Sequence, residues 1–351
     1  MPIRCAVAGL NRGSRFVQML QENPHCEVVA VCDPRPDKLA QMSGIQGFEA
    51  FDEMLDKASV DMVAIITPGP LHAPQSIAAL QAGCHVLVET PNVYSIEQAT
   101  AVVQLARGKG LKYMLAEDYV YMGWCRRAAQ AVESGTLGDI IGATGEYTHD
   151  CRGFVFADED GNTVPFSRAQ EPGIRPLWRL TDLPPLTYSS HTLGPLLELM
   201  DDRCITASGV CGGRHEVAGL DVFPLEFATL TTQKGAVVNL TNGFILGHPL
   251  GFAFSLYGTE GSLRITNTGT PQAFVASDAQ GSQWQELPMP WQEREDGRPH
   301  VQVMVDEFVD SLVNDTSPPF DEARSMDFCL PGVVAHESAR QGGTRIDLPL
   351  F

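Results

Sequence analysis

Short apolar runs alternate with helical patterns along the first third of the chain. The runs that predict strands are Ile3–Ala8, Glu27–Cys32, Met62–Thr67, His85–Glu89 and Lys112–Ala116. The patterns that predict helices are Arg15–Glu22, Asp37–Met42, Pro74–Ala82 and Ile96–Lys109. Continuous apolar strands separated by helices are typical of a parallel sheet that is covered on both faces. We therefore predict a doubly wound Rossmann-type α/β domain over residues 1–122.

The pattern changes after residue 122. Alternating strands are predicted at Ile140–Tyr147, Ala207–Cys211, Leu225–Thr232, Ala236–Thr241, Ala253–Gly258 and Ser262–Thr266, and helices at Arg126–Ser134, His300–Asn314 and Ala335–Arg340. Turn pairs such as Lys234-Gly235 favour hairpins. Residues 123–351 are thus expected to form an α+β domain with a largely antiparallel open sheet. Within it, Arg152–Pro185 is long enough to be a substrate loop or lid.

Composition narrows the class of protein. The 351 residues suit two domains, and the formal net charge of -19 would repel nucleic acid and anionic membranes. No run of 18 apolar residues exists, and the start lacks the features of a signal peptide, so a cytoplasmic protein is expected. The nine cysteines contain no Cys-x-x-Cys pair and the histidines show no metal spacing, so we expect reduced thiols and no metal.

A glycine-rich turn follows the first predicted strand. Gly9 and Gly13 are present, although the usual fingerprint has glycines at its first, third and sixth places. Asn11 and Arg12 lie between them and are expected to help hold a pyrophosphate. The alternative is a plain glycine-rich turn.

An acidic residue follows the second predicted strand. Asp33 lies 24 residues after Gly9, where a carboxylate can accept hydrogen bonds from ribose hydroxyls. It would repel a ribose phosphate, which favours NAD over NADP, while nearby Arg35 weakens that preference. A turn or helix-capping aspartate is the alternative.

Two further strand ends carry candidate cofactor contacts. Thr67, Pro68 and His72 follow the third long strand, and Glu89 and Pro91 follow the fourth. Residues at the carboxyl ends of parallel strands line the dinucleotide crevice of such domains. For Glu89 the alternative is a surface glutamate before a turn proline.

The ordered series Ala8-Gly9, Val31-Cys32-Asp33, Thr67-Pro68, His72, Gly83-Cys84-His85-Val86 and Glu89-Thr90-Pro91 resembles the glucose-fructose oxidoreductase, inositol dehydrogenase and MocA (Gfo/Idh/MocA) family. The resemblance covers essentially the whole chain. It implies a Rossmann domain followed by an open-sheet domain that binds substrate and pairs subunits, hence a homo-oligomer formed through the open sheet.

The chain departs from the common family pattern at two places. Thr90 stands where most members have lysine, and Thr187 stands where aspartate usually precedes the catalytic histidine. Both departures put an ordinary dehydrogenase in doubt.

The remaining motifs resemble the NAD-dependent glycosidase branch, whose known members include α-N-acetylgalactosaminidases. They are Glu117-Asp118-Tyr119-Val120-Tyr121, Tyr147-Thr148-His149-Asp150-Cys151-Arg152, Trp178-Arg179 and Tyr188-Ser189-Ser190-His191-Thr192-Leu193-Gly194-Pro195. The branch implies that the sugar is oxidised at carbon 3, loses the proton on carbon 2, expels the group on carbon 1, adds water and is reduced again.

The resemblance assigns roles to particular side chains. His191 is the expected base for the sugar hydroxyl, because imidazole titrates near neutral pH. Tyr121 and Tyr188 are candidates for the carbon 2 proton or the ketone oxygen, and Glu89 would contact the nicotinamide or the sugar. His149, Asp150, Arg152, Trp178 and Arg179 are expected to bind the substrate. A helix-capping histidine and packing tyrosines are the alternatives.

The sequence leaves two other functions open. One is a true NAD-dependent sugar or polyol dehydrogenase in which His191 suffices without the lysine. The other is a dinucleotide-binding protein without catalytic activity.

Overall fold

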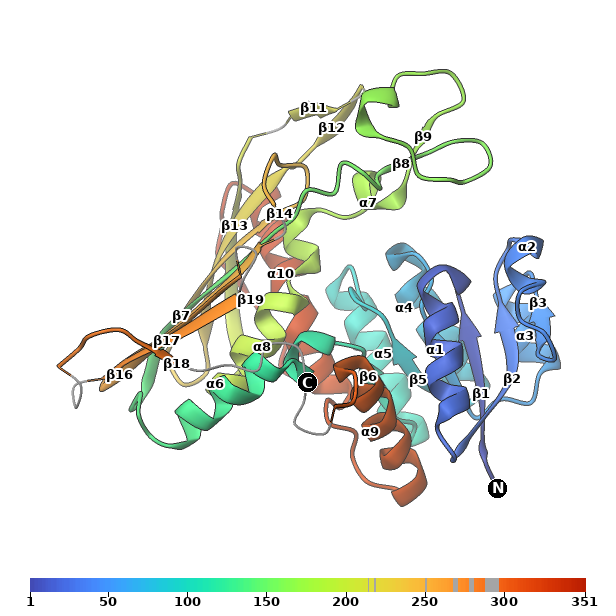
Figure 1. The fold of residues 1–351 in the computed structure, drawn as a ribbon, viewed down its shortest axis with the longest axis horizontal. Coiled ribbons are helices and arrows are strands. Elements are labelled where there is room, and N and C mark those ends of the chain that lie inside the picture. Colours follow the sequence, from blue (N-terminus) through green and yellow to red (C-terminus); the bar gives the residue numbers. More distant parts are fainter. Residues whose placement is uncertain (214, 218, 250, 268–270, 278–280, 288–296) are drawn as a thin grey trace. The chain divides into compact units, whose positions relative to one another are not determined.

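The computed structural model describes residues 1–213, 215–217, 219–249, 251–267, 271–277, 281–287 and 297–351 (Figure 1). Two compact units form within it. The first contains Met1–Asp118, Arg298–Met326 and Phe351, and the second contains Tyr119–Gly297 and Asp327–Leu350. The division at residue 122 stays a prediction, and the contacts group Arg298–Met326 with the first unit rather than with the second. Among the described helices, none has the length and apolar character needed to cross a membrane.

The first unit is built on a six-stranded parallel sheet in the order β3-β2-β1-β4-β5-β6. Its strands are β1 (Ile3–Ala8), β2 (Cys26–Cys32), β3 (Gln46–Phe48), β4 (Met62–Ile65), β5 (His85–Val88) and β6 (Tyr113–Leu115). Its helices are α1 (Leu10–Glu22), α2 (Pro36–Leu39), α3 (Phe51–Lys57), α4 (His72–Ala82), α5 (Ile96–Lys109) and α9 (His300–Asn314). This strand order is that of dinucleotide-binding domains.

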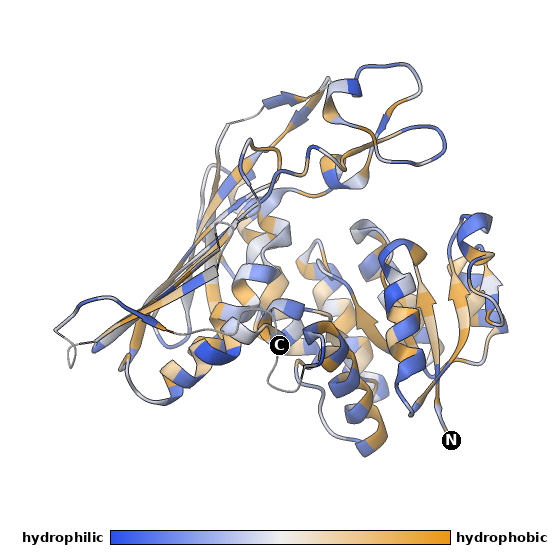
Figure 2. Ribbon diagram, in the orientation of Figure 1, coloured by the Kyte–Doolittle hydropathy of each residue, from blue (hydrophilic) through white to orange (hydrophobic). Residues whose placement is uncertain are grey.

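Burial explains why these segments form strands and helices. All of β4 is buried, as are the last four residues of β1, which accounts for their unbroken apolar sequences. Figure 2 shows the strands of this sheet mainly in the hydrophobic colour. Helix α1 turns Phe16, Val17 and Leu20 to the sheet and leaves polar residues outside. The predicted doubly wound domain is confirmed, with β3 and α3 as additions.

The second unit contains a nine-stranded sheet in the order β18-β17-β16-β15-β7-β14-β13-β10-β19. Its strands are β7 (Ile140–Thr148), β10 (Cys204–Cys211), β13 (Leu225–Thr232), β14 (Val237–Gly243), β15 (Gly251–Gly258), β16 (Gly261–Asn267), β17 (Pro271–Ser277), β18 (Gln285–Leu287) and β19 (Ile346–Asp347). Neighbouring strands are antiparallel except β7 and β14, which are parallel. The expected largely antiparallel sheet is confirmed.

The two faces of this sheet differ. The same unit contains three helices beside the sheet, namely α6 (Gly123–Glu133), α8 (Ser190–Met200) and the part of α10 (Glu322–Arg340) from Asp327 onward. Helix α8 lies so close to β7 that a Cβ placed on Gly145 would be 3.0 Å from Leu196 and Thr192. The opposite face exposes Val210, Phe227, Val237 and Tyr257, since alternate strand residues point to opposite faces. The sheet is therefore covered on one face and open on the other.

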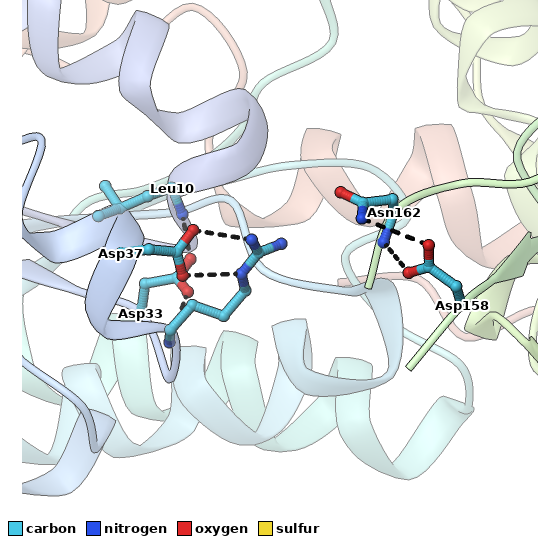
Figure 3. Close-up of polar contacts among 6 residues, drawn as sticks. Leu10, Asp33, Asp37, Asp158 and Asn162 are labelled. Carbon is cyan, nitrogen blue, oxygen red and sulfur yellow. Dashed lines mark hydrogen bonds and ion pairs between the residues drawn. The ribbon is translucent and has the colours of Figure 1, made fainter. Parts of the chain in front are cut away.

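The segment expected to be a substrate loop has some regular structure. It contains the paired strands β8 (Phe156–Ala157) and β9 (Arg175–Pro176) and the short helix α7 (Trp178–Thr181). A turn after β8 is closed by Asp158, whose carboxylate accepts a 2.8 Å hydrogen bond from the Asn162 backbone N–H (Figure 3). Two more short strands, β11 (His215–Val217) and β12 (Leu220–Val222), form a separate pair.

Candidate active site

The turn between β1 and α1 is shaped by its two glycines. Gly9 has a φ of 85°, and a Cβ there would lie 2.6 Å from the Ile66 carbonyl oxygen. A Cβ on Gly13 would lie 3.1 Å from Val7 Cγ1, so this residue allows α1 to pack tightly on β1. Gly13 thus has the role of the third glycine of the fingerprint, which allows close packing of helix and strand, although it stands one place earlier in the sequence. Asn11 is exposed in the first turn of α1.

Asp33 links the end of β2 to this turn. Its Oδ2 accepts a 2.7 Å hydrogen bond from the Leu10 backbone N–H, and its Oδ1 accepts one of 3.0 Å from the Arg35 N–H (Figure 3). A carboxylate has about four lone-pair sites, so both oxygens can still accept ribose hydroxyls. The Arg35 guanidinium pairs with Asp37, with Nη2 and Oδ2 2.8 Å apart, and this contact holds the pKa of Asp37 below its usual value. Asp33 therefore fits a cofactor with a free ribose hydroxyl.

Arg12 connects the ends of β5 and β6. Its Nε lies 2.5 Å from Glu89 Oε1, and its Nη2 lies 3.5 Å from Asp118 Oδ2. Asp118 also lies 3.5 Å from His300 Nε2 of α9. Glu89 and Asp118 are nearly buried, whereas about half of the Arg12 side chain is exposed. One guanidinium thus pairs with two carboxylates at the strand tips, while about half of its side chain stays exposed to solvent.

His72 joins two other strand ends. Its Nδ1 lies 2.8 Å from the Pro91 carbonyl oxygen and its Nε2 lies 2.6 Å from the Thr67 carbonyl oxygen. The ring is fully buried, and burial lowers its pKa. Thr67 Oγ1 donates to Gln75 Oε1 at 2.6 Å, while Pro68 stays exposed. In this arrangement His72 positions the ends of β4 and β5, and Pro68 is open to a ligand.

His191 lies in the first turn of α8, within a cluster of aromatic rings. Its ring stacks on Tyr119, with centroids 4.3 Å apart and planes inclined by 14°. Tyr188 approaches the ring edge-on, at 5.0 Å and 88°. Only 5% of His191 is exposed. The imidazole is therefore held in a fixed plane among hydroxyl-bearing rings.

Tyr147 is the centre of this cluster. Its ring contacts those of Tyr119, Tyr188 and His191, with centroids 5.4 to 6.2 Å apart. Burial raises the pKa of Tyr147 well above 10, and the neighbouring Tyr119 and Tyr188 add to this shift. A phenol with such a pKa stays protonated and can donate a hydrogen bond. Tyr147 is thus a donor rather than a base.

The residues expected to bind substrate occupy the end of β7 and the segment after it. His149 is half-buried, its Nδ1 has no hydrogen-bond partner among the described residues, and burial lowers its pKa. Arg152 forms two bonds with Asp150, with Nε–Oδ1 at 2.8 Å and Nη2–Oδ2 at 2.7 Å. That pairing leaves His149 as the polar group best placed to accept a ligand.

Trp178 and Arg179 form a stacked pair in α7. The Arg179 guanidinium carbon lies 4.7 Å from the centre of the Trp178 ring. Trp178 is partly exposed and Arg179 is exposed. The pair forms a flat surface with a charged face, which suits a hydroxylated ring.

The sequence does not predict roles for Tyr119 and Tyr147 of this cluster. The sequence predicts Tyr121 as a site residue, and in the structure Tyr119 is the ring that stacks on His191 while Tyr121 is buried in the same 3-10 turn. Tyr147 could have been found from strand alternation, because Ala143 and Gly145 of β7 point to the same buried face. No sequence pattern signals the stacking of two rings 72 residues apart.

The first unit matches a known family of enzymes. Residues 3–117 match the model of an oxidoreductase family with an NAD-binding Rossmann fold. Residues 3–117 are therefore similar to the NAD-binding Rossmann domain of the Gfo/Idh/MocA oxidoreductase family. The predicted cofactor, NAD, is the one that this family's fold binds, and the glycine turn and Asp33 described above fit it.

Proteins that are similar to most or all of the chain have different activities. A glycosyl hydrolase family 109 protein of Streptomyces niveus is 24% identical, over 99% of this chain and 77% of its own length. An α-N-acetylgalactosaminidase of Bacteroides fragilis is 26% identical, over 74% of this chain and 67% of its own length. A levoglucosan dehydrogenase solved with NADH and L-sorbose superposes with a TM-score of 0.80 at 18% identity, covering 100% of both chains. The last likeness establishes the fold.

Proposed function

We propose that the chain is an NAD-dependent enzyme acting on carbohydrates, and specifically a glycoside hydrolase that works by transient oxidation of the sugar. The observation that carries this proposal is the buried imidazole of His191, held between Tyr119 and Tyr188, in a chain with Thr90 at the usual lysine position. The names of the curated relatives support the glycosidase branch.

The first unit would bind the cofactor. Gly9, Asn11, Arg12 and Gly13 would receive the pyrophosphate at the start of α1, where backbone N–H groups and the helix dipole favour anions. Asp33 would hold the adenosine ribose. When bound, NAD supplies the hydride acceptor for carbon 3 of the sugar and returns the same hydride at the end.

His191 would remove the proton of the carbon 3 hydroxyl as the hydride leaves. The transfer of both hydrogens turns the carbinol into a ketone, so a base has to contact the oxygen at that moment. The stack on Tyr119 covers one face of the imidazole, so the ring would act on the substrate through a nitrogen at its edge. Tyr147, kept protonated by burial, would donate to the ketone oxygen.

The ketone makes the carbon 2 proton acidic. Tyr188 or Tyr121 would take that proton and pass it to the oxygen of the leaving group as the bond from carbon 1 to that group breaks. Water then adds its hydroxyl to carbon 1 and a proton to carbon 2. The net reaction is hydrolysis without net redox change.

The sugar would be recognised by the segment after β7. Trp178 offers a ring face to a pyranose, while Arg179 and His149 offer hydrogen bonds to its hydroxyls. Glu89 would contact the nicotinamide or the sugar at the strand tips, where its ion pair with Arg12 offsets the negative charge of the carboxylate.

A net dehydrogenase is the second candidate, and it is favoured by the fold shared with levoglucosan dehydrogenase. In that case His191 alone takes the hydroxyl proton and the oxidised sugar leaves as product. A dinucleotide-binding protein without activity is the third candidate. The threonine at position 90 weighs against the second candidate, because it cannot carry a proton as lysine can.

A panel of nitrophenyl glycosides, each with and without added NAD+, separates the three candidates. The glycosidase releases nitrophenol without accumulating NADH. Accumulation of one NADH per free sugar oxidised would instead establish the dehydrogenase. The absence of both activities in a chain that still binds NAD would leave only the third candidate, and failure to bind NAD would rule out all three.

The open face of the nine-stranded sheet is proposed to pair two copies of the chain. Val210 and Phe227 face each other across β10 and β13, and Val237 and Tyr257 continue this exposed apolar surface. The threonines and asparagine between them, Thr229, Thr231 and Asn239, are polar, which fits an interface that is partly wet. Sedimentation of the purified chain tests this, and a monomer at all concentrations would contradict it.

A further inference from the structure

A buried carboxylate on the covered face of the nine-stranded sheet has no part in the proposed reaction. Glu226 of β13 is 0% exposed, and both of its oxygens are engaged. Burying a carboxylate is costly unless charged or hydrogen-bonding groups surround it. The groups around this one are a thiol, an imidazole and a backbone N–H.

The thiol and the imidazole come from two different elements. Cys211 lies directly opposite Glu226 in the register of β10 and β13, and its Sγ is 3.1 Å from Glu226 Oε1. His336 projects from α10, and its Nδ1 is 2.7 Å from the same oxygen. The sulfur, oxygen and nitrogen atoms all lie within 4.8 Å of one another.

The backbone fixes this trio in place. Helix α10 approaches β10 so closely that a Cβ on Gly209 would overlap the Ala335 carbonyl, one residue before His336. Ser338, two residues after His336, accepts a 3.0 Å hydrogen bond from the Gly209 N–H through its Oγ. Because contacts on both sides of His336 tie the helix to the strand, the imidazole is directed at Glu226 by the packing itself.

We propose that Cys211, Glu226 and His336 bind a divalent transition metal of the zinc class. Thiolate, carboxylate and imidazole are the three ligand types that Zn²⁺ takes, at about 2.0 to 2.3 Å, and such ligands are usually arranged as a tetrahedron. Small outward movements of the three side chains make room for the ion. The Cys211 thiol gives its proton to solvent, the imidazole carries its own proton on Nε2, and a water molecule completes the tetrahedron.

Access and support for the ion are both present. Cys211 and His336 are partly exposed, which gives the ion a path of entry. The second oxygen of Glu226 accepts a 2.9 Å hydrogen bond from the Leu186 N–H, and ligand carboxylates commonly have such an outer partner. Phe223 covers the imidazole edge-on, with ring centroids 5.7 Å apart. These contacts orient the ligands before any metal arrives.

The site is connected to the candidate active site through Leu186. That residue belongs to the 3-10 turn Pro185–Tyr188, which ends in Tyr188 and leads into α8 and His191. A metal bound to Glu226 Oε1 would hold the carboxylate in place. Glu226 Oε2 would then hold the 3-10 turn through its hydrogen bond from the Leu186 N–H. The ion is thus a structural support for the turn and takes no part in the sugar chemistry.

Metal content tests this proposal without reference to catalysis. Purified chain incubated with Zn²⁺ and then dialysed should retain one equivalent, and Co²⁺ in its place should give sulfur-to-cobalt charge-transfer absorption. Cys211→Ser and His336→Asn should each lose the retained metal, and Cys211→Ser should also lose the charge-transfer absorption. Cys26→Ala, which removes a half-buried thiol of the first unit, should keep both signals.

A second measurement uses only the wild-type chain, so it does not depend on whether the variants fold. In the wild-type chain, Zn²⁺ should slow the reaction of Cys211 with a thiol reagent, as read by mass spectrometry of the labelled peptide, while the rate at Cys26 stays unchanged. Failure to retain Zn²⁺ or Co²⁺, together with equal labelling of Cys211 with and without Zn²⁺, would overturn the proposal. The three groups would then be a buried hydrogen-bonded cluster alone.

Discussion

The imidazole of His191 lies flat on the phenol ring of Tyr119, with ring centroids 4.3 Å apart. Stacking fixes the plane of the imidazole, and the edge-on ring of Tyr188 limits its rotation. A proton acceptor with so little freedom loses little entropy when a substrate hydroxyl approaches its edge. The pair therefore connects the packing of the second unit to the proposed chemistry.

Replacing His191 by alanine should lower kcat by about 100- to 10,000-fold, the usual contribution of a positioned acid or base. NAD affinity, measured by titration calorimetry, should stay within a few-fold, because the cofactor residues lie in the first unit. His215→Ala is the matched control, since His215 is exposed in β11 and should keep full activity. Equal activity in His191→Ala would remove this residue from the mechanism.

The stack itself is tested at Tyr119. Tyr119→Leu should lower the free energy of unfolding, with about 0.5 to 1.5 kcal/mol of the loss due to the ring pair alone. Tyr119→Phe keeps the ring and should keep most of that stability and of kcat. Urea unfolding and steady-state kinetics measure both quantities. If the leucine and phenylalanine variants are equally stable and equally active, the stack has no role.

Asp33→Asn should weaken NAD binding. A hydrogen bond to a charged group contributes about 1.5 to 3 kcal/mol, which corresponds to roughly 10- to 100-fold in affinity. The ratio of NAD affinity to NADP affinity should also fall, because the carboxylate that repels a ribose phosphate is removed. Asp37→Asn is the control, since it breaks only the exposed ion pair with Arg35. Unchanged NAD and NADP affinities in Asp33→Asn would refute the assignment.

His85 makes stability depend on pH. The Lys112 N–H donates to His85 Nδ1 at 2.9 Å, which requires a neutral ring, and burial lowers the His85 pKa below 6.5. Between the folded and unfolded pKa values the unfolded chain binds more protons, so the free energy of unfolding falls as the pH drops below about 6.5. Urea midpoints measured through that range should fall less steeply in His85→Gln. If the urea midpoints of the wild-type chain and of His85→Gln fall equally steeply with pH, His85 is not the source of the pH dependence.

Much of the first unit could be predicted from sequence because its strands are apolar from end to end and its turns carry glycine. The apolar pattern predicts β1 with its observed bounds and places Asp33 at the end of β2. The short β3 and α3 were not predicted, since three and seven residues are too few to show a period.

The rest depends on contacts between distant segments. The grouping of α9 with the first unit is visible only in space, through bonds such as that of Asn23 Nδ2 to Asp306 at 2.8 Å. The sequence predicts Arg12 as a phosphate ligand but does not indicate its pairing with Glu89 and Asp118. In the same way, Cys211, Glu226 and His336 are separated by up to 125 residues and meet only when α10 packs on β10.

The proposed mechanism is tested most directly by the hydrogen at carbon 2 of the released sugar. Turnover of an accepted glycoside in D₂O with NAD+ should give a product that carries deuterium at carbon 2, read by mass spectrometry or NMR, because that proton is removed and replaced during hydrolysis. Hydrolysis that leaves carbon 2 fully protonated, or that proceeds equally well in protein stripped of NAD, would contradict the account.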